Sequence, residues 1–114
     1  MAGVVFEKRR FRRIGCHIRS WVKNKTQASY SGSSGTISDI SEGGVRFQSS
    51  EPLSMNDEYY LSLDIPGQIT VDTYVKPLWF WRGSRRKQCE TGACFVSIHP
   101  EDRNLIRQLV TSKL

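Results

Sequence analysis

The 114-residue sequence predicts an all-β domain: a small antiparallel β-barrel, plugged or flanked by a C-terminal α-helix. About six segments alternate apolar and polar residues with the period of two that is typical of half-buried strands. Gly, Pro, Asn and Asp separate these segments, as they do in turns. After Pro100 the apolar residues recur at helical spacing instead. A chain of this length has room for one hydrophobic core, so we expect a single domain over residues 1–114.

The first half of the chain contains three predicted strands. Residues 14–23 alternate apolar and polar side chains, which indicates a half-buried strand. Residues 24–36 contain no Val, Ile or Leu and are rich in Ser, Gly and Thr, so we expect a loop there. A short strand is expected over residues 37–39, and another over residues 45–50, where apolar and polar side chains alternate again.

The clearest hairpin in the sequence joins residues 59–65 to residues 69–75. Pro66 and Gly67 fit the central pair of a type II turn, because Pro fixes φ and Gly accepts a positive φ. Pro77 has no N–H to donate, so we expect it to interrupt the strand ladder.

The last part of the chain changes from strands to a helix. An aromatic extended stretch, residues 78–81, leads into a basic turn and then into a last strand over residues 88–98. Pro100 fits the first helical position, and the two acids after it favour the positive end of the helix dipole. An apolar stripe follows at Leu105, Ile106, Leu109 and Val110. We expect the barrel over residues 14–98 and the helix over residues 100–112.

Composition limits the class of protein. Hydrophobic residues make up 38% and charged residues 25%, which is typical of a folded, soluble domain. No apolar run is long enough for a transmembrane helix, and the short apolar N-terminus does not fit a signal peptide. Cys16, Cys89 and Cys94 fit neither a disulfide framework nor a zinc site, but rather small buried residues in a reducing compartment. We therefore expect a cytoplasmic protein with no membrane insertion, no metal and no cofactor.

The positive charge is concentrated at the N-terminal end. Residues 1–25 contain eight Lys or Arg and one acid, a net charge of +7, whereas residues 26–114 contain nine against ten acids, a net charge of −1. The sequence RRFRR at residues 9–13 holds four of these charges. A guanidinium pairs in bidentate fashion with phosphate or with the O6/N7 edge of guanine. This stretch indicates an anion site, but a solvated basic arm, or one that loosely binds nucleic acid, fits the arginines alone as well.

A second motif, Asp39-Ile40-Ser41-Glu42-Gly43-Gly44, complements the first. A carboxylate at Asp39 can accept hydrogen bonds from the N1–H and N2–H₂ edge of a guanine, or orient an arginine. The hydroxyl of Ser41 can bind a phosphate oxygen or another base edge. Gly43 and Gly44 permit a positive φ and close backbone approach. Taken alone, the motif also fits an ordinary β-turn capped by Asp and Ser.

Together, Arg9-x-x-x-Arg13 and Asp39-x-Ser41-x-x-Gly44 resemble the two signature motifs of the PilZ domain family. Each motif is short, but their order and spacing in one chain are specific. The resemblance covers residues 7–112 and includes the flanking residues 7–11 and 39–47, with Gly92 and Phe95 in the last predicted strand.

This resemblance implies a bacterial receptor for cyclic di-GMP, built as a six-stranded antiparallel PilZ-type β-barrel with a C-terminal helix. Residues 1–13 would then form a flexible, arginine-rich loop that closes over the ligand, which such domains often bind as an intercalated dimer. The resemblance implies that Arg9, Arg10 and Arg13 contact guanine edges and phosphates. It also implies that Asp39, Ser41, Gly43 and Gly44 hold the ligand from the barrel surface.

Two tryptophans share one face of the strand that follows Pro77. Aromatic residues at Trp79 and Trp81 belong more often to a core or a barrel rim than to a ligand site. In the PilZ family, however, an aromatic residue in the equivalent strand can flank the nucleotide. On this basis Trp81 is a candidate for contact with a base.

Binding, rather than catalysis, is the expected activity. The sequence shows no metal cluster, no nucleophile–base pair and no phosphate-cradling loop, so we expect no catalytic residues and no enzyme. A receptor would change conformation on binding and signal to a partner protein in motility, biofilm or polysaccharide production. The alternative is a small basic β-barrel that binds single-stranded nucleic acid through its arginines and aromatic residues.

Overall fold

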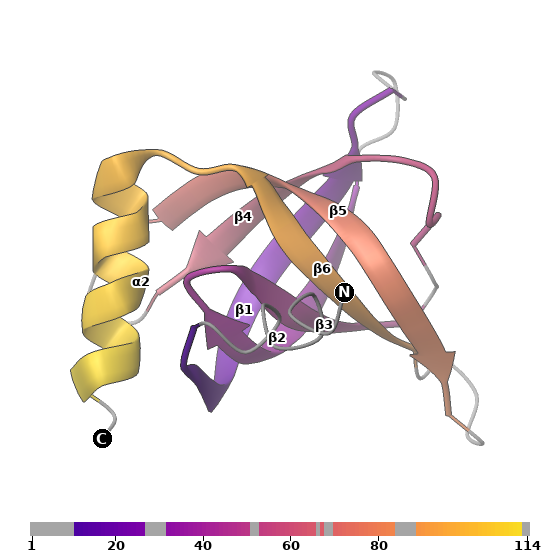
Figure 1. Cartoon of the computed structure of the whole chain (residues 1–114). Coiled ribbons are helices and arrows are strands. Elements are labelled where there is room, and N and C mark those ends of the chain that lie inside the picture. The colour runs from indigo at the N-terminus through magenta and orange to yellow at the C-terminus, as the bar shows by residue number, and fades with distance from the viewer. Residues whose placement is uncertain are drawn as a thin grey trace, which may run out of the picture.

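Six antiparallel strands close into a barrel in the computed structural model, which describes residues 11–26, 32–50, 53–65, 67, 70–83 and 89–112 (Figure 1). The strands follow one another around the barrel in the order β1-β2-β3-β6-β5-β4. They are β1 (Arg13–Asn24), β2 (Ser33–Ser41), β3 (Gly44–Ser49), β4 (Tyr59–Asp64), β5 (Thr70–Arg82) and β6 (Cys89–Ser97), and the helix is α2 (Pro100–Ser112). The predicted fold class is therefore confirmed.

The barrel is filled by the apolar side chains that alternate along its strands. Strand β1, for example, buries Ile14, Ile18 and Val22 and exposes most of the residues between them. Burying each such side chain contributes roughly 1.5–3 kcal/mol, so one shift of register would lose many of these contributions at once. The fully buried large members of the core include Phe47, Ile37, Ile40, Leu61, Leu63, Val71 and Val75.

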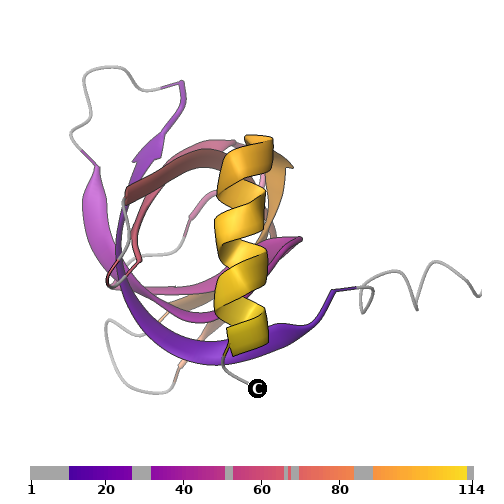
Figure 2. The ribbon, with the colours of Figure 1, turned by 90° about the vertical axis from the view of Figure 1, so that its left-hand side faces the viewer.

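Helix α2 lies across one open end of the barrel (Figure 2). Its buried residues, Ile106 and Val110, are one helical turn apart and belong to the same core cluster as the strand residues. Glu101 and Asp102 lie in the first turn, as the sequence predicts. The helix thus supplies the apolar cap that this end of the barrel requires.

Two local expectations were wrong. Strand β2 begins at Ser33, so the last part of the predicted 24–36 loop is a strand that pairs with β1 up to Val22. Strand β5 continues through Pro77, with a shift of register between Pro77 and Trp79 rather than an interruption. The described pairing of β5 with β4 ends at Val75, so the missing N–H of Pro77 removes no bond from that ladder. The predicted glycine in the β4–β5 turn is confirmed by its φ of 74° at Gly67, whereas Pro66 lies outside the described residues.

Candidate functional site

Arg13 lies directly opposite Ser41 in the β1–β2 ladder. Their neighbours Ile14 and Ile40 form the next pair of the ladder and are buried in the core. Because successive side chains of a strand point to opposite faces, Arg13 and Ser41 both lie on the outer face of the barrel. The fold therefore brings together the two motifs that are separated in the sequence.

Asp39 lies one step further along this outer face, between Gly15 of β1 and Arg46 of β3. Its Oδ2 is 3.7 Å from Nη2 of Arg46, and its side chain is only 15% exposed. Its Oδ1 is buried and accepts no hydrogen bond within the part of the chain that the structure describes. A buried carboxylate oxygen without a donor is unfavourable, so this atom favours the arrival of a hydrogen-bond donor from elsewhere.

The turn from β2 to β3 is held by two hydrogen bonds of Gly43, one to the side chain of Ser41 and one to β6. The backbone N–H of Gly43 donates to Oγ of Ser41 at 3.1 Å, and the carbonyl of Gly43 accepts from the N–H of Phe95 at 3.0 Å. Neither Gly43 nor Gly44 has a positive φ, contrary to the expectation from the sequence. Gly44 is needed instead because the backbone of β6 approaches it closely. A Cβ at Gly44 would lie 2.1 Å from the carbonyl oxygen of Ala93 on β6.

Glu42, in the same turn, connects the site to helix α2. Its Oε1 lies 3.0 Å from Nη2 of Arg107 and 3.4 Å from Nε of Arg103. The hydrogen bond from Arg107 lowers the pKa of the Glu42 carboxyl, against the opposing effect of partial burial. The guanidinium of Arg103 also lies 5.1 Å from the centre of the Phe11 ring, a cation–π distance. The turn, the helix and the segment before β1 therefore meet in one cluster.

A row of residues crosses five strands of the outer face at the level of Asp39. We call it the Asp39 row; its successive cross-strand partners are Gly15, Asp39, Arg46, Gly92 and Trp79. The indole of Trp79 covers Gly92, because a Cβ at Gly92 would lie 2.2 Å from the ring. The row therefore places a carboxylate, a guanidinium and a flat aromatic surface on one face.

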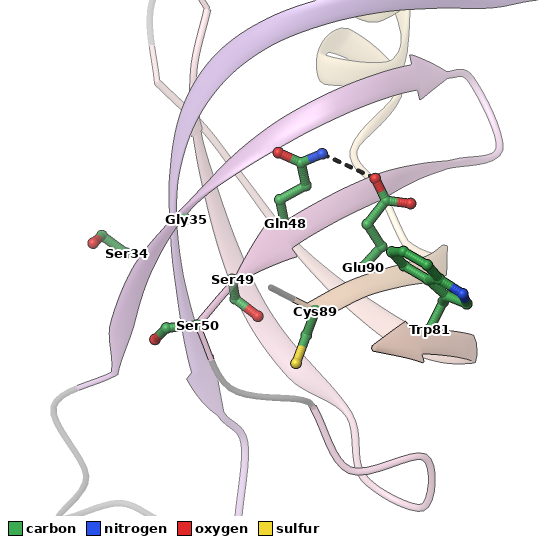
Figure 3. Close-up of a pocket in the computed structure, with 8 residues that line it drawn as sticks. All are labelled: Ser34, Gly35, Gln48, Ser49, Ser50, Trp81, Cys89 and Glu90. Atoms are coloured by element: carbon green, nitrogen blue, oxygen red, sulfur yellow. Dashed lines mark hydrogen bonds between the residues drawn. The ribbon is translucent and has the colours of Figure 1, made fainter. Parts of the chain in front are cut away.

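Trp81 lies on the same face, one step further from Asp39 and opposite Glu90. It lines a cavity of about 520 Å³ together with Gln48 and Glu90 (Figure 3). Thus the structure puts Trp79, rather than the predicted Trp81, in the row that contains Asp39. Arg9 and Arg10 lie outside the described residues.

Sequence reasoning missed Arg46 and Glu42 as neighbours of the predicted residues, and it favoured Trp81 over Trp79, which lies in the Asp39 row. A hairpin turn at residues 42–43 could have revealed Arg46, because it pairs Ile40 with Val45 and hence Asp39 with Arg46. No local signal links Glu42 to arginines 61 and 65 positions later.

Two features are absent from the described residues. No helix among them is long and apolar enough to cross a membrane. No group of three or more His, Cys, Asp or Glu side chains in the described ranges could hold a metal ion.

The model of the PilZ domain family matches residues 7–112. The chain belongs to the PilZ domain family. Solved structures agree with this assignment at the level of the fold. The PilZ domain of YcgR from Escherichia coli, solved with c-di-GMP, has a TM-score of 0.73 at 13% identity, over 92% of this chain and 90% of that one.

Two further similar structures are of chains longer than this one. The Bacillus subtilis inhibitor of motility MotI/DgrA has a TM-score of 0.77 at 12% identity, over 91% of this chain but 50% of that one. The MrkH–c-di-GMP complex from K. pneumonia has a TM-score of 0.64 at 21% identity, over 90% of this chain and 50% of that one. This PilZ domain thus spans about half the length of these two proteins. No individual curated protein shows a sequence match to this chain.

Proposed function

We propose that this PilZ domain is a receptor for cyclic di-GMP that changes conformation on binding and thereby signals to a partner protein. The observation that carries this proposal is the buried Oδ1 of Asp39, which has no donor within the described residues and lies beside the Arg13–Ser41 pair. A guanine supplies adjacent N1–H and N2–H₂ donors for such a carboxylate. The similar structures from Escherichia coli and K. pneumonia were solved with c-di-GMP, which supports the choice of ligand.

Each predicted residue has a role in this proposal. Arg13, with Arg9 and Arg10 from the segment before β1, binds phosphate oxygens and the O6/N7 edges of guanine. Asp39 accepts from a guanine, while Ser41 and the turn formed by Gly43 and Gly44 hold the ligand against the barrel. The aromatic surface of β5 provides stacking, to which the predicted Trp81 and its neighbour Trp79 both belong.

The ligand acts by stabilising one conformation of the receptor. It can do so only if it binds that conformation more tightly than the other. The segment before β1 carries the arginines, and its described end, Phe11, contacts Arg103 of α2. Closure of this segment over the ligand would therefore alter the surface near α2. The partner would be a cytoplasmic protein of motility, biofilm or polysaccharide production, and the similar Bacillus subtilis protein is an inhibitor of motility.

The nucleic-acid alternative is not favoured. Asp39, Glu42 and Glu90 lie on or beside the same face as Arg13 and would repel a continuous phosphate backbone. A compact ligand can place its guanines at the carboxylates and its phosphates at the arginines. We assign binding, and no catalytic step, to these residues.

Isothermal titration with cyclic di-GMP tests the proposal. The wild type should bind, and Arg13→Ala and Asp39→Ala should each weaken binding about 10- to 100-fold, as expected for a lost hydrogen bond to a charged group. Asp64→Asn on β4, outside the site, should bind as the wild type does. A stoichiometry of two ligands per chain would indicate the intercalated dimer. Absence of binding by the wild type at micromolar protein would contradict the proposed function.

A further inference from the structure

A second row of side chains lies next to the Asp39 row on the outer face. Its cross-strand partners, from β2 to β5, are Thr36, Gln48, Glu90 and Trp81, and we call it the Glu90 row. It is displaced from the Asp39 row by two residues along β3, β6 and β5, and by three along β2, where the register shifts between Ile37 and Asp39. The two rows are therefore roughly 7 Å apart. Both rows end at a tryptophan of β5. A ligand that lies on the Asp39 row can therefore extend onto the Glu90 row.

The Glu90 row presents hydrogen-bond acceptors to its cavity. Nε2 of Gln48 donates to Oε2 of Glu90 at 2.9 Å (Figure 3). This bond uses a donor of Gln48 and fixes the amide, so its Oε1 and the second oxygen of Glu90 remain as acceptors. No cation among the described residues forms an ion pair with Glu90. The carboxylate of Glu90 can thus accept a hydrogen bond from a ligand, and its negative charge disfavours a phosphate group at this position.

Trp81 adds a flat apolar surface to these acceptors. Trp81 is 58% exposed, although its side chain is one of the largest apolar groups in the chain. It lies opposite Glu90 in the ladder, at the wall of the 520 Å³ cavity. An aromatic plane beside a carboxylate is complementary to a planar group with donors along its edge, because the plane stacks while the edge forms hydrogen bonds. The cavity volume is in the range of small-molecule sites, which is about 300–1,000 Å³.

We propose that the Glu90 row is a guanine subsite, which receives the guanine of cyclic di-GMP that Asp39 does not bind. This inference rests on the proposed function and names a second point of base recognition within it. The N1–H and N2–H₂ groups of guanine donate to Glu90, and the base stacks on Trp81. Adenine presents an acceptor at N1, which the carboxylate repels. The row therefore discriminates guanine from adenine at the second base.

A comparison of cyclic di-GMP with cyclic GMP–AMP tests this assignment by titration. The hybrid ligand contains one guanine, so it can satisfy Asp39 and leave adenine at the Glu90 row. The wild type should bind cyclic di-GMP at least about tenfold more tightly than it binds the hybrid, as expected for one base-specific pair of hydrogen bonds. Glu90→Gln should lower the ratio of the two affinities severalfold, because the new amide keeps the hydrogen bond with Gln48 and can donate to N1 of adenine. Trp81→Ala should weaken both ligands and leave the ratio unchanged, because stacking does not distinguish purines.

The controls separate this inference from the proposed function. Asp72→Asn removes an acid from the β4–β5 part of the barrel and should leave both affinities as in the wild type. If the wild type does not bind cyclic di-GMP, the proposed function fails. If the wild type binds but Glu90→Gln keeps the same ratio between the two ligands, the guanine subsite is wrong while the receptor function stands. Thermal melting of each variant verifies that it is folded, and a surface change at Glu90 should alter the melting temperature little.

Discussion

Glu42 and Arg107 form an ion pair, with 3.0 Å between Oε1 and Nη2, that joins the β2–β3 turn to helix α2. Arg103 approaches the same oxygen at 3.4 Å and also lies over the Phe11 ring. Glu42 follows Ser41 and precedes Gly43, both of which are candidate ligand residues. The β2–β3 turn, through Glu42, and Phe11 therefore both contact arginines of the helix that caps the barrel.

Replacement of Glu42 by Gln should loosen helix α2. The variant keeps the size of the side chain but removes the charge that both arginines share. Because Arg103 and Arg107 are 41% and 55% exposed, solvent screens the interaction, and we expect the melting temperature to fall by only about 2–5 °C. Amide hydrogen exchange should increase in α2 more than in the strands. Glu101→Gln is the matched control, since the side chain of Glu101 is 88% exposed. If both variants lowered the melting temperature equally, the ion pairs of Glu42 would not be what holds the helix.

The same ion pair should make part of the stability depend on pH. The pKa of Glu42 in the folded protein lies below its ordinary value of 4.5, mainly because of the hydrogen bond from Arg107. A depressed pKa stabilises the folded state above the ordinary value, and this contribution disappears as the pH falls through the lower, folded pKa. The difference in melting temperature between wild type and Glu42→Gln should thus be constant above about pH 5 and shrink below 4.5. A difference that grows on acidification would exclude this linkage.

The alternation of apolar residues was sufficient to predict the barrel and its helix. Ile14, Ile18 and Val22 point into the core as the period of two requires, and Ile106 and Val110 do so at helical spacing. The family motifs also predicted which parts of β1 and β2 meet, and the ladder between these strands places Arg13 opposite Ser41. These features depend on patterns within short stretches of the sequence.

Features that depend on contacts between distant segments were not predictable. Residues 33–36 form a strand although their composition favours a loop, because β1 offers them a ladder from Arg19 to Val22. Pro77 lies within β5 because β4 does not pair there, which only the barrel topology determines. The pairing of Glu42 with the helix arginines joins segments more than 60 positions apart, with no local pattern to indicate it.

Substitution of Gly44 by Ala should destabilise the barrel rather than merely weaken ligand binding. The added Cβ would lie 2.1 Å from the carbonyl oxygen of Ala93, a backbone atom that cannot move without shifting β6. Such overpacking costs about 1–3 kcal/mol, which urea denaturation can measure. Gly15→Ala is the control on the same outer face, because its Cβ would be 3.9 Å from the nearest atom. Equal unfolding midpoints for the two variants would show that β3 and β6 separate more easily than this packing implies.

Substitution of Gly92 by Ala should displace the indole of Trp79 with little effect on stability. The new Cβ would lie 2.2 Å from that ring, but Trp79 is 43% exposed and its side chain can swing towards solvent. If the ring stacks on a base in the Asp39 row, the affinity for cyclic di-GMP should fall about tenfold, as for the loss of one stacked base.

The double variant distinguishes this explanation from a general disturbance of β6. Gly92→Ala and Trp79→Ala act through the same ring, so their effects on affinity should not add, and the double variant should bind no more weakly than Trp79→Ala alone. Titration of the four proteins with cyclic di-GMP measures this coupling, and tryptophan fluorescence of Gly92→Ala reports the altered surroundings of the indole. Additive losses of affinity would mean that Gly92→Ala weakens binding independently of Trp79, which would contradict this explanation.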